Sequence, residues 1–153
     1  MPPSDNRRCD RINRGIGKLK TVVIVRGSDD DRASFVPELM SAFTARLGGE
    51  VEADVIGVPD GAAESASARN DFKRAVLNHR KAVIVECRDD GRPAWKRFQQ
   101  VAMTHSDISF VWLVVDLGAR PDPRLSGIGP TMEAPTAIAV AISLHDIVTG
   151  KKQ

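Results

Sequence analysis

The sequence predicts a three-layer α/β domain built around a parallel sheet of four or five strands. Short, continuous apolar runs rich in β-branched residues recur along the chain, as expected of strands that are buried on both faces. Segments with apolar positions at helical spacing separate these runs. This alternation predicts βαβ units, whose right-handed crossovers place helices on both faces of the sheet.

Four apolar runs are the expected strands, and each is followed by a polar turn or loop. The runs cover 21–25, 51–58, 81–86 and 108–116. After the fourth run comes a segment of about 18 residues that is rich in Pro and Gly. This order of elements predicts a flavodoxin-like fold, in which the parallel sheet lies between two layers of helices.

The first helix follows an acidic turn whose carboxylates can cap it and favour its positive N-terminal end. We expect this helix over 33–47, with Pro37 in its first turn, where the missing N–H does little harm. Gly48 and Gly49 then end it. Its inward stripe runs in steps of four residues: Phe35, Leu39, Phe43 and Leu47.

Three more helices complete the pattern. Residues 59–67 are expected to form a loop, and the helix over 66–79 turns Phe72, Ala75, Val76 and His79 inward. The next helix begins near Pro93 and buries one face, composed of Trp95, Phe98, Val101 and Ala102. The last helix covers 135–148, and its expected inward face is Ile138, Ile142, and Ile147 or Val148.

Length and composition indicate one globular domain. The chain has 153 residues, of which 42% are hydrophobic and 27% charged. It has no apolar run long enough to span a membrane and no signal-peptide pattern, so we expect a cytoplasmic protein without a membrane partner. The two cysteines, Cys9 and Cys87, lie in unlike settings and are expected to be free thiols in a reducing compartment.

The first 20 residues form a basic leader, and the domain is expected over 21–150. The leader holds six basic and two acidic residues, which leaves 16 basic and 18 acidic residues for the rest of the chain. Such a leader could contact nucleic acid. It lacks interleaved aromatic residues, and its Pro, Ser, Asn and Gly prevent an apolar face. We therefore expect a flexible, solvated segment and no nucleic-acid partner.

Ligands of open parallel sheets bind beyond the carboxyl ends of the strands. The first loop there offers the N–H groups of Gly27 and Ser28 to a phosphate. It matches no phosphate-binding fingerprint, and its acids repel an anion unless Arg26 and Arg32 face it. The acidic residues at 29–31 and 89–90 are expected to be solvated turn residues, so no metal site is predicted.

Five segments in order carry a resemblance to a known family: "VVIVRGSDDDRASFVPELMSAF", "VPDG", "FKRAVLNHRKAVIVE", "RPAWKRFQQ" and "FVWLVVDLGARPDP". Each is similar to a segment of the TIR (Toll/interleukin-1 receptor) domain, and together they span about 21–123. The resemblance implies self-association, or assembly with other TIR-like domains, through the loop at Pro59, Asp60 and Gly61. It also implies NAD⁺ or an ADP-ribose-type nucleotide as ligand or substrate, with no tightly bound cofactor.

Enzymatic TIR domains cleave the bond between nicotinamide and ribose in NAD⁺, with a glutamate four residues after a tryptophan. Here the tryptophan is Trp95 and the later residue is Gln99. An amide keeps the shape and hydrogen bonding of the glutamate but lacks the charge that stabilises a cationic transition state. The resemblance therefore implies an impaired glycohydrolase whose pocket includes Arg26, Gly27, Ser28, Asp60, Gly61, Trp95 and Gln99.

Three explanations of Gln99 stay open: a natural non-catalytic TIR-like domain, an engineered Glu→Gln enzyme, or a superficial likeness. A second family is also open, because "VIVRGSDDDRASFVPEL" and "VIVECRDDG" echo Toprim domains, which use acidic residues for Mg²⁺ and phosphodiester chemistry. The Toprim glutamate would fall at Arg26, however, and a cation there opposes metal binding. Besides an impaired glycohydrolase and a Toprim-like protein, a TIR-like scaffold that only binds other proteins is a third possible function.

Overall fold

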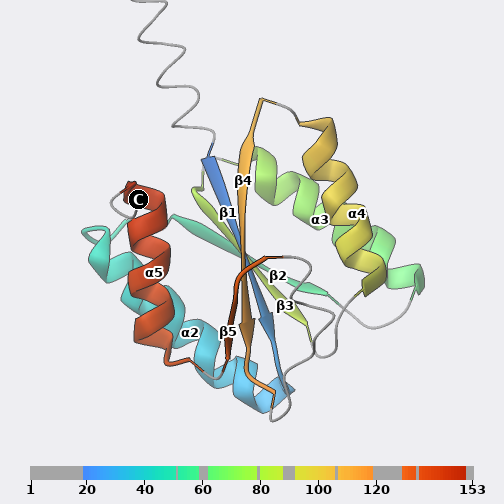
Figure 1. Ribbon diagram of the computed structural model, residues 1–153. Helices are drawn as coiled ribbons and strands as arrows, with labels where there is room; N and C mark the ends of the chain where they lie inside the picture. Colours follow the sequence, from blue (N-terminus) through green and yellow to red (C-terminus); the bar gives the residue numbers. More distant parts are fainter. Residues whose placement is uncertain are drawn as a thin grey trace, which may run out of the picture.

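A five-stranded parallel sheet lies between two pairs of helices in the computed structural model of this chain (Figure 1). The structure describes residues 19–50, 52–58, 62–78, 80–87, 92–105, 107–118, 129–133 and 135–150. The side chains of 58, 62–66 and 92–97 lie outside this description. The three-layer α/β architecture predicted from the sequence is confirmed.

The strands are β1 (Leu19–Arg26), β2 (Ala53–Val58), β3 (Ala82–Cys87), β4 (Ser109–Asp116) and β5 (Thr131–Glu133). Their order in the sheet is β2-β3-β1-β4-β5, and all four pairings are parallel. Compared with the 2-1-3-4-5 order of flavodoxin, β1 and β3 have exchanged places. The first strand is therefore central and is paired on both sides.

The helices are α2 (Asp29–Arg46), α3 (Ala62–Leu77), α4 (Arg92–Thr104) and α5 (Ala137–Thr149). Figure 1 shows α2 and α5 on one face of the sheet and α3 and α4 on the other, and each pair packs together. The strand order explains this division. The connection from β1 to β2 runs across the sheet in one direction, and the connections from β2 to β3 and from β3 to β4 run in the other. Because all these crossovers are right-handed, connections that run in opposite directions cover opposite faces of the sheet.

The alternating side chains of β1 contribute to a separate core on each face. Val22 and Ile24 join the core under α3 and α4, while Val23 and Val25 join the core under α2 and α5. The first core contains Phe72 and Phe98, whose stacked rings have centroids 4.3 Å apart. Phe72, Phe98 and Val101 are buried as predicted. His79 and the side chain of Trp95 lie outside the described residues.

Two predicted helix starts are wrong, and both helices begin earlier. Ser28 is the N-cap of α2, so the acidic residues 29–31 form its first turn and Pro37 lies in its interior. Pro37 is exposed, and solvent can satisfy the carbonyl that its missing N–H leaves open. Helix α3 begins at Ala62, within the predicted loop 59–67, where Ala and Glu favour a helix.

The predicted inward face of the last helix is wrong at Ile138 and Ile142, whereas Val148 packs against the core as predicted. Ile138 is 53% exposed and Ile142 is 40% exposed, whereas Ala137, Val140, Ala141 and Leu144 are buried. Apolar residues surround most of this helix, so its period does not determine which face packs inward. The face that packs against α2 and the sheet carries the smaller alanines. Among the described helices, none is long and apolar enough to cross a bilayer.

Lys20 is a buried cation near the amino end of β1. Its side chain is folded against the carbonyl groups that follow α3, donating to the oxygen of Asn78 at 2.6 Å and to that of Arg80. Burial lowers the pKa of Lys20 below its ordinary value, and the carboxylates of Asp54 and Glu52 oppose this shift. The lysine thereby ties the first strand to the turn that leads into β3.

Candidate functional site at the carboxyl edge of the sheet

The sheet register brings three residues to one level at its carboxyl edge. Arg26, the last residue of β1, is aligned with Cys87 of β3 and with Asp116 of β4. The chain leaves β1 for α2 on one face and leaves β3 for α4 on the other. The ends of β1 and β3 therefore form a topological switch point, the position at which open parallel sheets bind their ligands.

Arg26 and Asp116 form an ion pair across the ends of β1 and β4. The Nη1 of Arg26 donates to Oδ1 of Asp116 at 2.6 Å. The Asp116 side chain is only 1% exposed, and its Oδ1 also accepts the Gly118 N–H at 3.0 Å. A carboxylate this deeply buried needs such partners, because an isolated buried charge is strongly destabilising.

Arg32 connects the beginning of α2 to β1 and β3. Its Nε donates to the carbonyl oxygen of Gly27 at 2.9 Å, and its Nη1 donates to Oε1 of Glu86 at 3.2 Å. Its Nη2 donates to the carboxylate of Asp29. Ser28 completes the turn, since its Oγ accepts the N–H of Asp31 at 3.2 Å.

Two glycines permit the close packing of these loops. A Cβ placed on Gly27 would lie 2.9 Å from Cβ of Leu117, and a Cβ placed on Gly118 would overlap Nη1 of Arg26. A larger residue at position 27 would push the β1–α2 turn away from Leu117, and one at position 118 would displace the Arg26 guanidinium from its place beside Asp116.

The charges at this edge are largely matched in pairs. Asp116 faces Arg26, and Glu86 faces Arg32. Within the described ranges there is no group of three or more His, Cys, Asp or Glu that could hold a metal ion. The N–H of Gly27 donates to the Cys87 carbonyl at 3.1 Å, so it is not available to a phosphate as the sequence suggested. Ser28, which is exposed, and the N-terminal turn of α2 are the parts open to a ligand.

The predicted site residues are brought together only in part. Arg26, Gly27 and Ser28 lie side by side at the carboxyl end of β1. Gln99 lies on α4, where it is exposed, one position beyond the buried Phe98. Asp60, Gly61 and the side chain of Trp95 fall outside the described residues.

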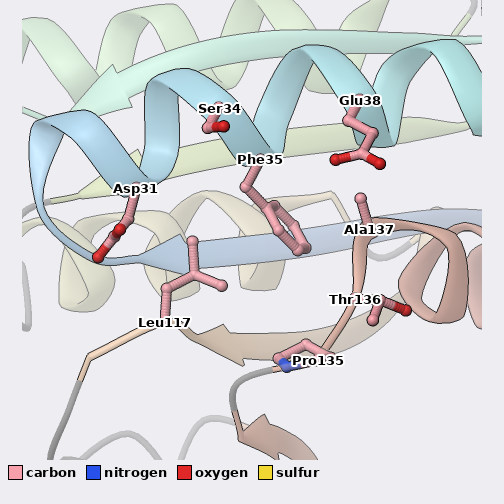
Figure 2. A pocket seen from close by; sticks show the side chains of 8 residues that line it. All are labelled: Asp31, Ser34, Phe35, Glu38, Leu117, Pro135, Thr136 and Ala137. Atoms are coloured by element: carbon pink, nitrogen blue, oxygen red, sulfur yellow. The ribbon is translucent and has the colours of Figure 1, made fainter.

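A cavity of about 420 Å³ lies between α2 and the start of α5 (Figure 2), on the face of the sheet opposite α4 (Figure 1). Helix α2 contributes Asp31, Ser34, Phe35 and Glu38 to its wall. The opposite wall is formed by Leu117, which follows β4, and by the start of α5: Pro135, Thr136 and Ala137. Gln99 does not line it, so this cavity is distinct from the pocket predicted around that residue.

Sequence reasoning missed Asp116, Glu86 and the cavity. Asp116 and Glu86 are charged residues at or next to the carboxyl ends of strongly apolar strands, and this position is the signal that could have identified them. The cavity depends on the approach of α5 to α2, which no local pattern of the sequence encodes.

Together the fold and this edge define a three-layer α/β domain with a charged switch-point site on its central strand. No family model, curated protein or solved structure matches the chain.

Proposed function

We propose that this chain is a TIR-like domain that binds NAD⁺ or a related nucleotide at the carboxyl edge of its sheet. One observation carries the proposal: Arg26 and Ser28 lie at the end of the central strand, at the switch point between β1 and β3. The N-terminal turn of α2 begins there and offers N–H groups to a phosphate. The Arg26 side chain is 20% exposed beside it.

The proposed domain turns its nucleotide over slowly or not at all. Glycoside cleavage passes through a cationic transition state, which a nearby carboxylate stabilises. Gln99 supplies an amide at the position where TIR enzymes carry glutamate. A missing full charge is worth a few kcal/mol, and about 1.4 kcal/mol corresponds to a tenfold change in rate.

The decisive experiment restores the charge. Purified Gln99→Glu protein is compared with the original chain for nicotinamide release from NAD⁺, and we expect an increase of roughly 100-fold or more. Gln100→Glu is the matched control, since Gln100 is the next residue and is also exposed. It adds the same charge to the same helix turn and should leave the rate unchanged.

Binding is tested separately by calorimetric titration with NAD⁺, ADP-ribose and cyclic ADP-ribose. If one of these nucleotides gives a binding heat but Gln99→Glu releases no nicotinamide, the chain is a nucleotide-binding domain without glycohydrolase activity. Silence with all three nucleotides at millimolar concentration would refute the proposed ligand. Equal activation by Gln99→Glu and Gln100→Glu would refute the role of position 99.

A second candidate function is that of an interaction scaffold, which the place of β2 favours. β2 is the outermost strand on its side of the sheet, and Val55 on this strand is 40% exposed. The segment at Pro59, Asp60 and Gly61 follows this edge strand directly. In the scaffold, Gly61→Arg should abolish self-association measured by sedimentation velocity while the melting temperature holds. A chain that stays monomeric at every concentration would exclude this function.

A further inference from the structure

The cavity between α2 and α5 combines an apolar middle with acidic ends (Figure 2). Its volume of about 420 Å³ falls in the range of small-molecule sites, which run from roughly 300 to 1,000 Å³. Phe35 and Ala137 are 8% and 4% exposed and belong to the core beneath it. Leu117 packs against the same core and points toward Phe35 in Figure 2.

The acidic ends come from the periodicity of α2. Asp31, Phe35 and Glu38 follow each other at steps of four and three residues, so they share one face of the helix. Figure 2 shows the two carboxylates on either side of the Phe35 ring. The seven-residue separation corresponds to about 10 Å along a helix. This spacing is too long for both carboxylates to chelate one small cation, but it leaves an apolar surface between two negative ends.

The described wall of the cavity holds acidic but no basic side chains. Among the described residues, neither Lys nor Arg lines it, and no ion pair engages Asp31 or Glu38. The two arginines nearest in sequence are held elsewhere: Arg26 pairs with Asp116, and Arg32 contacts Asp29, Glu86 and the Gly27 carbonyl. An anionic ligand would therefore be repelled, whereas a cationic ligand would be attracted at both ends.

We propose that this cavity binds an aliphatic diamine, with an ammonium group at each carboxylate and the methylene chain over Phe35 and Leu117. Each ammonium has three donors and no acceptor, so it needs several oxygen partners. Ser34 and Thr136 also line the cavity, and their hydroxyl oxygens can act as further acceptors. Thr136 already accepts the N–H of Ala139 as the cap of α5, and its second lone pair is open to an ammonium. This site adjoins the proposed nucleotide site, because Asp31 lies in the first turn of α2, but the argument for it does not rest on nucleotide binding.

The experiment is calorimetric titration of the full chain with 1,5-diaminopentane, 1-aminopentane and pentane-1,5-diol. The diamine should bind at least tenfold more tightly than the monoamine, and the diol should give no heat. Asp31→Asn and Glu38→Gln should each weaken diamine binding about tenfold and bring it to the level of the monoamine. Both substitutions are isosteric and lie at exposed positions, so the fold should be kept; Asp31→Asn should lower the free energy of unfolding by no more than about 1 kcal/mol, because it removes one charge from the first turn of α2.

Asp30→Asn is the matched control, because Asp30 lies in the same helical turn as Asp31 but does not line the cavity. Diamine affinity in this variant should change less than twofold. If Asp30→Asn weakens binding as much as Asp31→Asn, the diamine responds only to the general negative charge of α2 and the proposal fails. It also fails if the diamine and the monoamine bind equally, or if neither binds at millimolar concentration.

Discussion

At the scale of single residues, the carboxyl edge is organised by contacts between the loops after β1 and β4. Gly27 is pressed against Leu117, and Gly118 is pressed against the Arg26–Asp116 pair. The sequence marks Gly27 as part of a turn, but the residue it contacts is far away in the chain. The importance of Gly27 could be predicted locally, while its reason, a close tertiary approach, could not.

The contact predicts a large difference between two glycine substitutions. Gly27→Ala should lower the free energy of unfolding by about 1 to 3 kcal/mol, since its new methyl group overlaps the Leu117 side chain. Gly57→Ala in β2 has open space around it, so it should be neutral or stabilise by up to roughly 1 kcal/mol. Urea unfolding measures both values. Equal effects of the two changes would show that Gly27 and Leu117 are not in close contact.

At the scale of elements, the sequence predicts the positions of the strands more accurately than it predicts where helices begin or which helix face is buried. All four predicted strands are present with bounds shifted by one or two residues, because short, continuous runs of β-branched residues bounded by polar turns favour strands over helices. α5 shows the opposite case. It is apolar on most sides, so the choice between its isoleucine face and its alanine face depends on how closely α2 can approach.

Matched truncations on α5 test which face is buried. Leu144→Ala should lower the free energy of unfolding by about 2 to 5 kcal/mol, because Leu144 is fully buried under α2 and the sheet. Ile138→Ala removes a similar side chain from a position that is 53% exposed, and should lower it by less than about 1 kcal/mol. Chemical denaturation followed by circular dichroism gives both numbers. A larger loss for Ile138→Ala than for Leu144→Ala would show that the isoleucine face predicted from the sequence is the buried one.

At the scale of the whole molecule, the architecture could be predicted, but the strand order could not. Local patterns indicate that strands and helices alternate, and the handedness rule then requires helices on both faces. They do not indicate that β1 pairs with β3 and β4 instead of β2. The candidate site was predictable only as the carboxyl edge of the sheet. Its ion pairs depend on the strand order, which joins Arg26 to a residue 90 positions later.

The burial of Lys20 gives the global stability a dependence on alkaline pH. The folded chain releases this proton below 10.5, the ordinary pKa at which the unfolded chain releases it. Within that window the unfolded state holds more protons, so the free energy of unfolding rises with pH. Below the window both states are charged, and the desolvation penalty is fully present.

Urea unfolding of the original chain and of Lys20→Met, at a series of pH values up to 10.5, measures this effect. As pH rises, the free energy of unfolding of the original chain should increase relative to that of Lys20→Met. Lys81→Met is the control, because Lys81 is exposed, and its difference from the original chain should be constant. Parallel pH profiles for the original chain and Lys20→Met would contradict the lowered pKa.

The central position of β1 also sets the sequence of events during synthesis. Of the described strands, β1 leaves the ribosome first, yet its two partners are the third and fourth of them. β2 and β3 are neighbours in both chain and sheet, so they can pair as soon as β3 emerges. Until then the apolar β1 has two open edges, a form prone to aggregation and suited to capture by chaperones. The nascent chain therefore carries its most buried strand unprotected until β3, and on its other side β4, has been made.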